Sequence, residues 1–284
     1  MRILIYGSKG WIGNMIVSKW TELYPSHTII CSETRILPEN TDKLKQEIKN
    51  ADRVFCCIGR TTGGGIPNID YLEDHLDENV RDNLFGPMLL CKLCDSLGVH
   101  FSYIGTGCIF STNTRDINTY NYTEEDAPDY FGSAYSVVKG YTDSLMKLYS
   151  LNTLNLRIRM PVTNDLSPKN FITKISKFEN ICSYPNSMTY LPDLIPVMID
   201  MSCKKLSGTY NMVNGSMSHG EILDLYREII DNRHTYNLIE EDALNTMLKA
   251  KRSNNILCNK KLCRSYKIRP LQECVIEALN NMKK

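Results

Sequence analysis

Two side chains whose pairing could move a proton stand four residues apart in the segment Tyr135-Ser-Val-Val-Lys139. In a helix this spacing places the phenol and the ammonium on one face. A free tyrosine has a pKa of about 10, too high for proton transfer at neutral pH, and a nearby ammonium favours the phenolate and lowers that pKa. Because the same spacing also occurs by chance as a solvated pair, it indicates an acid–base site only in a supporting context.

A glycine-rich turn near the N-terminus supplies such a context, where Y-G-S-K-G-W-I-G follows the apolar segment RILIY. Gly7 permits a tight turn, Gly10 lets the backbone approach a pyrophosphate, and a following helix offers N–H groups to an anion. The spacing G-x-x-G-x-x-G, which ends at Gly13, is one residue longer at its front than the usual fingerprint. We interpret it as a dinucleotide site, the alternative being a plain glycine-rich turn.

Charged residues beyond this turn bear on the choice of dinucleotide. Glu33 falls near the end of the second predicted strand, about 20 residues past the glycines, where a carboxylate would hold the ribose hydroxyls of NAD. Lys9 and Arg35 are cations that could pair with a 2′-phosphate, Arg35 in a bidentate manner. We therefore predict NADPH ahead of NADH, the alternative being a solvated surface role for all three side chains.

The eleven cysteines are spread through strand-like and helix-like segments, without a secretory signal. We expect reduced thiols in place of a disulfide framework. Cys91 and Cys94 form a C-x-x-C, but LLCKLCDSLG has the pattern of an amphipathic helix and no second pair at zinc spacing accompanies it. We predict no metal site.

The elements that must position these residues follow from a regular alternation along the chain. Short apolar strands suit a sheet buried on both faces, and right-handed crossovers make such a sheet doubly wound. The predicted strands are RILIY, HTIIC, RVFCCIG, HFSYIG and LNLRIRM, and the predicted helices run to about residue 24, over 41–50, over 71–97 and over SAYSVVKGYTDSLMKLY. The fold class is therefore α/β, a Rossmann-like doubly wound parallel sheet.

After Pro161 the pattern loosens, because four further prolines break up the elements that follow. We predict an NADP-binding Rossmann domain over residues 1–160. Residues 161–284 would form mainly a smaller C-terminal substrate-binding lobe, with some segments returning to the Rossmann domain.

Charge and hydropathy exclude several classes of partner. The chain has 33 Lys and Arg residues against 32 Asp and Glu, and no basic block, so nothing indicates nucleic acid or an anionic membrane. No stretch approaches about 20 uninterrupted apolar residues, and MRILIYG enters a strand directly. We expect a cytoplasmic protein whose partners are small molecules.

With these glycines, Thr106 and the Tyr135–Lys139 pair, the chain resembles the extended short-chain dehydrogenase/reductases that act on nucleotide sugars. It is further similar to the plant-type nucleotide-rhamnose synthase/epimerase-reductase through G-W-I-G, G-G-I-P-N-I-D, T-G-C-I-F, Y-S-V-V-K, R-I-R-M-P, N-F-I-T-K-I, P-N-S-M-T and R-S-N-N. This resemblance implies conversion of UDP-4-keto-6-deoxyglucose to UDP-rhamnose. Spacing and composition alone indicate only a dinucleotide-dependent reductase.

The resemblance also implies roles in reduction. Lys139 would hold the nicotinamide ribose and tune Tyr135, Tyr135 would protonate the oxygen at carbon 4 of the sugar, and Thr106 would hydrogen-bond that oxygen. Related dehydratases carry Thr-Asp-Glu where this chain has Thr106-Gly107-Cys108. Because those acids are missing, we predict no dehydratase activity, with the 4-keto sugar supplied by a separate 4,6-dehydratase.

Inversion at carbons 3 and 5 requires one group to remove a proton and another to return one from the opposite face. A thiol, with a free pKa of about 8.5, and a desolvated lysine can both take part near neutral pH. The resemblance implies that Cys108 and Lys174 form this acid–base pair. Without it, we would interpret Cys108 as a buried structural thiol and Lys174 as a surface cation.

Further positions follow from the resemblance. Asn170 would contact the diphosphate, Arg252 a phosphate, and Asn83 would support the active-site lysine, although an asparagine can also bond its own backbone or face solvent. The predicted cofactor site comprises Gly7, Lys9, Gly10, Trp11, Ile12, Gly13, Arg35, Gly59, Tyr135, Lys139 and Pro161. The predicted substrate site comprises Asn83, Thr106, Asn170, Asn186, Met188 and Arg252.

We therefore predict a bifunctional 3,5-epimerase/4-reductase that makes UDP-L-rhamnose with NADPH. The alternatives are a 4-keto reductase alone, an enzyme for a dTDP- or GDP-linked sugar, and a redox-inert nucleotide-binding regulatory protein on the same fold. Relatives often pair through helices that correspond to residues 71–97 and 133–150, so a homodimer is possible, and a monomer fits the sequence equally.

Overall fold

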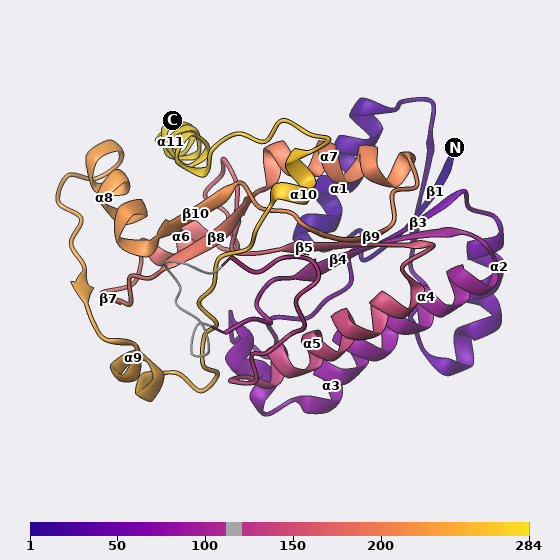
Figure 1. Ribbon diagram of the computed structural model, residues 1–284, viewed down its shortest axis with the longest axis horizontal. Coiled ribbons are helices and arrows are strands. Elements are labelled where there is room, and N and C mark those ends of the chain that lie inside the picture. Colours follow the sequence, from indigo (N-terminus) through magenta and orange to yellow (C-terminus); the bar gives the residue numbers. More distant parts are fainter. Residues whose placement is uncertain (112–120, 284) are drawn as a thin grey trace.

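A six-stranded parallel sheet, in the order β2-β1-β3-β4-β5-β9, forms the centre of the computed structural model, which describes residues 1–111 and 121–283 (Figure 1). Each neighbouring pair of strands runs parallel. The strands are β1 (Arg2–Tyr6), β2 (Thr28–Ser32), β3 (Arg53–Cys56), β4 (His100–Thr106), β5 (Thr153–Ile158) and β9 (Gly208–Asn211). The predicted Rossmann-like parallel sheet is confirmed.

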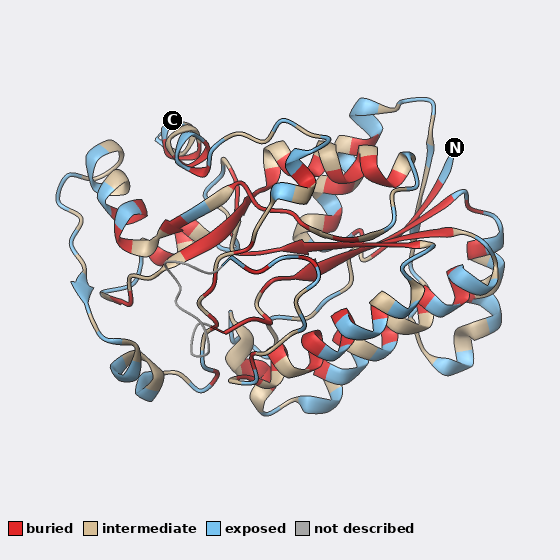
Figure 2. Cartoon of the chain, viewed as in Figure 1, coloured by how far each residue is buried: buried red, intermediate tan, exposed pale blue. Residues whose placement is uncertain are grey.

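Helices cover both faces of this sheet (Figure 1), and the central strands between them are buried (Figure 2). Side chains that alternate along the strands divide the core in two. Ile3 and Ile5 face one layer, whereas Leu4 faces the other. The first layer contains α1 (Trp11–Leu23), α7 (Leu191–Cys203) and α10 (Lys260–Cys263); the second contains α2 (Thr41–Lys49), α3 (Leu76–Val80), α4 (Gly86–Ser96) and α5 (Ala134–Met146). All seven residues of β4 are buried, as a strand covered on both faces requires.

The prediction of one continuous helix over residues 71–97 is wrong. The chain instead forms a 3-10 turn at Ile69–Glu73, then α3, a π-helical turn at Arg81–Phe85 and α4. Pro87 has no N–H to donate to the carbonyl of Asn83, four residues earlier, and the hydroxyl of Thr142 on α5 donates to that carbonyl at 2.7 Å. The wide turn therefore exposes a backbone acceptor that ties this region to α5.

A smaller lobe contains the three-stranded sheet β10-β8-β6 and its own core. Its elements are β6 (Pro161–Val162), α6 (Phe171–Ile175), β7 (Asn180–Ile181), β8 (Pro185–Tyr190), β10 (Gly215–Ser218), α8 (His219–Ile229), β11 (Asn237–Leu238), α9 (Glu241–Met247) and α11 (Leu271–Met282). Between these elements the chain returns to the large sheet through α7 and β9. We propose that the lobe begins at residue 161, just after β5.

The cysteines at positions 91 and 94 have no exposed surface and pack in the core between the sheet and α4. Within residues 1–111 and 121–283, no group of His, Cys, Asp and Glu side chains is placed to hold a metal ion. No helix in this described part of the chain is both long and apolar enough to cross a membrane.

Candidate active site

Several of the predicted site residues lie at the carboxyl edge of the sheet. Gly7, Gly59 and Thr106 come at or just after the ends of β1, β3 and β4, and the strand order reverses beside β1, which has β2 on one side and β3 on the other. In open parallel sheets ligands bind outside the strand ends at such a reversal. The topology therefore places the glycine turn at the same edge of the sheet as Thr106, with which Tyr135 forms a hydrogen bond.

The geometry of the glycine turn fits a dinucleotide. Gly7 has a φ of +78°, and a Cβ on Gly13 would lie only 2.1 Å from the Gly7 oxygen, so neither position accepts a side chain. Gly10 precedes the first residue of α1, where no side chain caps the helix and no acidic residue stands in the first turn. The N–H groups of half-buried Trp11 and Ile12 are thus placed for a pyrophosphate.

The two charges that favour different dinucleotides are bonded to each other. Lys9 Nζ lies 2.6 Å from Glu33 Oε1, and both side chains are exposed. This hydrogen bond raises the pKa of Lys9 and lowers the pKa of Glu33. Arg35 is exposed on the segment that follows β2. Lys9 and Glu33 neutralise each other. Of the two cations predicted to bind a 2′-phosphate, Arg35 is therefore the one without an ion pair to a carboxylate among the described residues.

Tyr135 occupies the first turn of α5, which begins where the Ser133 hydroxyl accepts the N–H of Ser136 at 3.1 Å. Burial, followed by the nearby Cys108 thiol, raises the pKa of the Tyr135 phenol, and a hydrogen bond with Thr106 acts in the opposite direction. Lys139 is not among the groups that shift this pKa, so its predicted tuning of Tyr135 stays a prediction. Thr106 also accepts the N–H of Cys108, at 3.1 Å, which couples the two residues.

Lys139 is buried one turn farther along α5, and its ammonium donates to the hydroxyl of Tyr103 on β4. The ammonium also lies 4.5 Å from the centre of the Tyr103 ring. Burial lowers the pKa of Lys139 to about 8, an effect partly offset by Cys56, Asp143 and Cys108. Lys139 can therefore exchange a proton near neutral pH.

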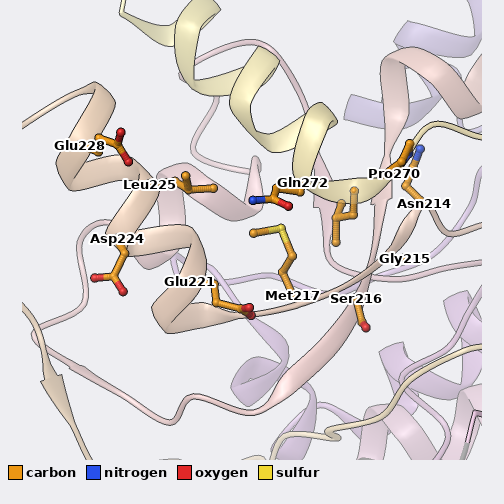
Figure 3. Close-up of a pocket in the computed structure, with 11 residues that line it drawn as sticks. Asn214, Gly215, Ser216, Met217, Glu221, Asp224, Leu225, Glu228, Pro270 and Gln272 are labelled. Carbon is orange, nitrogen blue, oxygen red and sulfur yellow. The ribbon is translucent and has the colours of Figure 1, made fainter.

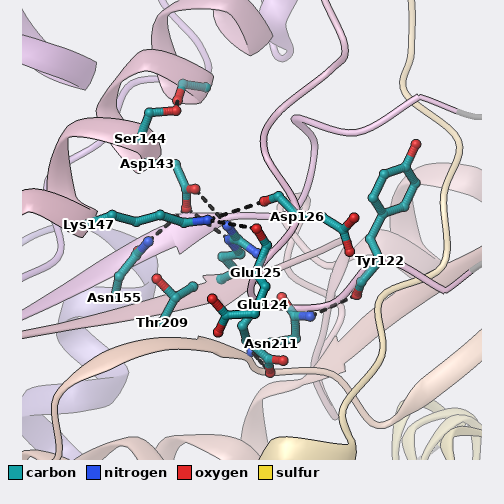
Figure 4. Close-up of polar contacts among 12 residues, drawn as sticks. Tyr122, Glu124, Glu125, Asp126, Asp143, Ser144, Lys147, Asn155, Thr209 and Asn211 are labelled. Carbon is teal, nitrogen blue, oxygen red and sulfur yellow. Dashed lines mark hydrogen bonds and ion pairs between the residues drawn. The ribbon is translucent and has the colours of Figure 1, made fainter. Parts of the chain in front are cut away.

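A buried ion pair fixes α5 against the sheet (Figure 4). Asp143 accepts from Arg157 Nε at 2.8 Å and Nη2 at 2.7 Å, and from the Asn155 amide at 2.7 Å. Lys147, farther along, donates to the carbonyls of residues 125 and 126 at 3.3 Å each. The helix that carries Tyr135 is thus held in one position relative to β5.

Cys108 lies half-buried directly after β4, and its sulfur accepts a hydrogen bond from Arg159 Nη1 at 3.5 Å. Arg159, just after β5, is 1% exposed. Sequence reasoning missed Arg159, although one signal was present. The segment LNLRIRM places two cations in a strand predicted to be buried on both faces, and each needs a compensating partner.

Lys174 is half-buried on α6, and its pKa is lowered by burial and by the charges of Lys169 and Arg252. Among the described residues its ammonium has no hydrogen-bond or ion-pair partner, so the structure does not bring it into contact with the sulfur of Cys108. Its predicted role as the second acid–base group therefore stays a prediction.

Three predicted substrate residues lie in the interior of the lobe. Asn170 is fully buried, donates to the carbonyls of Thr163 and Asp165 at 3.0 and 2.7 Å, and caps α6 by accepting the N–H of Ile172 at 3.3 Å. Asn186 and Met188, on β8, also have no exposed surface. The local backbone role left open for Asn170 is therefore the one that the structure shows.

Two others connect separate segments. Arg252 pairs with Asp70 at 3.0 Å, which joins the R-S-N-N and G-G-I-P-N-I-D blocks. Asn83 is buried, so it does not face solvent; its amide exchanges two 2.9 Å hydrogen bonds with the backbone of Arg60, beside exposed Gly59. Pro161 begins β6, where it pairs with Thr189 of β8.

Two cavities flank this arrangement. One, of about 420 Å³, includes Tyr130, Phe131 and Lys251 in its wall. Burial, followed by the charge of Glu241 in the same wall, raises the pKa of Tyr130 to about 12, and the charges of Arg252 and Arg159 act in the opposite direction. The other, of about 540 Å³, lies between β10, α8 and the start of α11 (Figure 3). None of the predicted catalytic residues lines either cavity.

The model of the NAD dependent epimerase/dehydratase family matches residues 3–176. The chain belongs to this family, and the predicted resemblance to extended dehydrogenase/reductases is confirmed.

Within this family, the chain is similar to several individual proteins along most of its length. The L780 protein of Acanthamoeba polyphaga mimivirus is 47% identical over 94% of this chain and 93% of its own. The crystal structure described as the L780 UDP-rhamnose synthase matches with a TM-score of 0.93 and 43% identity over 99% of both chains.

Two proteins of Arabidopsis thaliana are also similar. One, named a bifunctional dTDP-4-dehydrorhamnose 3,5-epimerase/dTDP-4-dehydrorhamnose reductase, is 38% identical over 91% of this chain and 85% of its own. The other is named a trifunctional UDP-glucose 4,6-dehydratase/UDP-4-keto-6-deoxy-D-glucose 3,5-epimerase/UDP-4-keto-L-rhamnose-reductase. It is 35% identical over 94% of this chain, which corresponds to 40% of its own length.

Proposed function

We propose that this protein is a 3,5-epimerase/4-reductase that converts UDP-4-keto-6-deoxy-D-glucose to UDP-L-rhamnose with NADPH. The observation that carries the proposal is the position of Cys108, which packs in one cluster with Tyr135 and whose backbone N–H donates to the Thr106 hydroxyl at the end of β4. A reductase needs a proton donor at the carbonyl, whereas an epimerase also needs a group that works at the neighbouring carbons. The similarity to L780 and to the Arabidopsis proteins supports the same assignment.

In the reductive half-reaction, Thr106 and Tyr135 hydrogen-bond the oxygen at carbon 4. Bound NADPH supplies the hydride. Tyr135 gives its proton to the developing alkoxide, and the high pKa of its buried phenol keeps that proton in place until then. Lys139, with a pKa of about 8, can replace the proton that Tyr135 gives up.

In the epimerising half-reaction, the hydrogens at carbons 3 and 5 are acidic because both carbons adjoin the carbonyl. Cys108 exchanges a proton with these carbons from one face, and Lys174 from the other. While either carbon is deprotonated, negative charge rests on the oxygen at carbon 4, where Thr106 and Tyr135 stabilise it. One pair of hydrogen-bond donors thus serves both half-reactions.

We propose that a separate 4,6-dehydratase supplies the substrate. Elimination of water would require acidic residues after Thr106, and this chain has Gly107 and Cys108 there. A Cβ on Gly107 would lie 2.4 Å from the side chain of Leu257, so a larger residue does not fit without rearrangement. The trifunctional Arabidopsis relative includes a dehydratase in its name, and this chain matches only 40% of its length.

The preference for NADPH rests on Arg35 and Lys9. A 2′-phosphate between them would draw Lys9 away from Glu33 and would engage Arg35, which makes no side-chain ion pair in the described structure. Both cations lie just past the ends of the two strands that border the glycine turn.

We also propose that two copies pair through α3 and α5, which pack against each other. The face that they present to solvent carries several large apolar side chains: Leu76, Val80, Tyr141, Leu145 and Leu148. A row of this kind on one side of a helix pair fits an interface between identical subunits.

The proposed reaction is tested by incubating the protein with UDP-4-keto-6-deoxyglucose, following NADPH absorbance and identifying the product by NMR. We expect stoichiometric NADPH oxidation and UDP-L-rhamnose. Competition with the dTDP- and GDP-linked 4-keto sugars tests the nucleotide, and NADH in place of NADPH tests the cofactor. A product with the original configuration at carbons 3 and 5 would leave a 4-keto reductase, and the absence of NADPH oxidation with all three sugars would refute the proposal.

A further inference from the structure

We propose that Arg159 is a positioning residue for Cys108, whose guanidinium aims the sulfur at the sugar and stabilises it each time it loses its proton. The inference rests on the proposed 3,5-epimerase activity and extends it to a residue that the sequence motifs do not single out.

The contacts of Arg159 converge on Cys108 from segments far apart in the chain. Nη1 donates to Cys108 Sγ at 3.5 Å and to the Gly107 carbonyl at 3.3 Å. It also lies 3.3 Å from the Ser253 hydroxyl, while Nη2 donates to the Ser253 carbonyl at 2.5 Å and to the amide oxygen of Asn186. One side chain thus binds the T-G-C-I-F, P-N-S-M-T and R-S-N-N blocks together.

The charge of Arg159 is not compensated by any carboxylate that it bonds. The side chain is 1% exposed, and burial lowers the pKa of its guanidinium, with Cys108 and then Tyr130 acting in the opposite direction. Its bonded partners are neutral oxygens and the sulfur of Cys108. Among these partners, only the sulfur belongs to an ionisable group, so a thiolate is the form of Cys108 that best matches the buried cation.

Arg157 provides an internal comparison two residues earlier. It is equally buried, but a carboxylate, Asp143, compensates it through two hydrogen bonds of 2.7 and 2.8 Å. Arg157, in β5, therefore has a structural anion as its partner, whereas Arg159, just after the strand, has the thiol of Cys108 as its only ionisable hydrogen-bond partner among the described residues. In addition, Arg159 Nε is buried without a hydrogen-bond partner among residues 1–111 and 121–283, a cost that a purely structural arginine would be expected to avoid.

The proposed step transfers one proton and involves no oxidation or reduction. When the thiolate of Cys108 takes the hydrogen from carbon 3 or carbon 5, the C–H bond breaks, an S–H bond forms, and the electron pair moves toward the oxygen at carbon 4. The hydrogen bond from Arg159 is stronger to the thiolate than to the thiol. It therefore favours the thiolate of Cys108 before the proton transfer, and it favours loss of the proton from the thiol after the transfer.

The test compares Arg159→Met, Arg159→Lys and a matched control, Ser253→Ala, which removes one hydroxyl partner of Arg159 but not the contact with sulfur. The first readout is the rate at which iodoacetamide alkylates Cys108, resolved peptide by peptide with mass spectrometry, and it needs no substrate. The second readout compares two rates: the rate of deuterium exchange at carbons 3 and 5, and the rate at which the already epimerised UDP-4-keto-rhamnose is reduced.

We expect Arg159→Met to lower both alkylation of Cys108 and exchange by about ten- to hundredfold, the size of a lost charge-assisted hydrogen bond, with reduction of the epimerised sugar within about twofold of wild type. Arg159→Lys should be intermediate and Ser253→Ala close to wild type.

Alkylation of Cys108 that is unchanged or faster in Arg159→Met would overturn the proposal. Faster alkylation is the result expected if Arg159 only holds the loop in place, because its loss would then expose the thiol. An equal loss of exchange and reduction in both Arg159 variants would also overturn the proposal. If wild type itself exchanges no deuterium, the proposed epimerase activity fails, and the alkylation rates still decide whether Arg159 activates Cys108.

Discussion

Tyr135 and Cys108 belong to one packed cluster, yet the half-reactions that we assign to them are chemically separable. The phenol works at the oxygen of carbon 4 and the thiol at the carbons beside it. Thr106, bonded to both residues, is the point where the two activities share machinery.

We therefore predict that Tyr135→Phe lowers NADPH oxidation by roughly 10²–10⁴-fold, the usual contribution of a general acid, while deuterium exchange at carbons 3 and 5 continues. Exchange persists because Thr106 still donates to the oxygen that carries negative charge. The two rates are measured on the same preparation by absorbance and NMR. Loss of exchange to the same extent as reduction, in a variant with unaltered circular dichroism, would show that the activities are not divided in this way.

The pKa of Lys139 predicts a dependence of stability on pH. Burial lowers this pKa to about 8 from the ordinary value of 10.5. Between these values the unfolded chain binds a proton that the folded chain lacks, so the free energy of unfolding of wild type rises with pH across this window. Relative to Lys139→Met, which cannot titrate there, wild type should gain roughly 2–3 kcal/mol between pH 7.5 and 10.5 in urea denaturation. A difference between the two proteins that stays constant with pH would contradict the burial of a titrating amine.

At the residue scale, the positions of side chains at a recognisable spacing could be predicted from the sequence. The roles of polar residues in the interior could not. Thr106, Tyr135 and Lys139 could be predicted because strand ends and a helical turn determine where their side chains lie. Asn186 and Arg159, by contrast, have residue types that suit a ligand or a buried network equally. Burial and partners decide between these roles, and both depend on segments more than 25 residues away in the chain.

At the scale of elements, α5 is the part whose position matters most, since it carries both Tyr135 and Lys139. The pair between Asp143 and Arg157 holds it to β5, and Thr142 holds it to the π-helical turn. Such a turn is the kind of irregularity that sequence periodicity does not reveal. The apolar pattern continues through residues 71–97, whereas the interruption depends on Pro87 and on the inward-facing side chain of Asn83.

We predict that Asp143→Asn destabilises the protein by roughly 3–5 kcal/mol, because it leaves the charge of fully buried Arg157 without its counter-ion. Asp42→Asn, at an exposed pair with Lys45 on α2, should change stability by less than about 0.5 kcal/mol. The free energy of unfolding in urea gives both values. Equal effects for the two substitutions would mean that the buried pair does not anchor α5.

At the scale of the whole molecule, the alternation of strands and helices in the parallel sheet could be predicted because local apolar patterns determine it, whereas the sixth strand, β9, was not predicted. The lobe could be placed only in outline, since its strands are as short as two residues and α7 and β9 leave it to join the large sheet. The connections between the lobe and the sheet, including the ion pair of Asp70 with Arg252, bring together segments that no local pattern links.

The proposed homodimer predicts an assembly that one charge can disrupt. Leu148, which is 77% exposed beside the end of α5, would be buried between subunits. We expect wild type to sediment as a dimer and Leu148→Glu to shift toward the monomer at micromolar concentration. Leu166→Glu, at a similarly exposed leucine of the lobe, is the control and should sediment as wild type does. A wild-type protein that is monomeric at all concentrations would refute this pairing.

The central claim is that one chain both epimerises and reduces, with Cys108 responsible for the first activity. Its most direct test is proton NMR of UDP-4-keto-6-deoxyglucose in deuterium oxide with NADPH, comparing wild type with Cys108→Ala. We predict UDP-L-rhamnose carrying deuterium at carbons 3 and 5 from wild type. The variant should incorporate no deuterium, yet it should still reduce UDP-4-keto-rhamnose. Full deuterium incorporation by Cys108→Ala, or reduction by wild type without any label, would contradict the account.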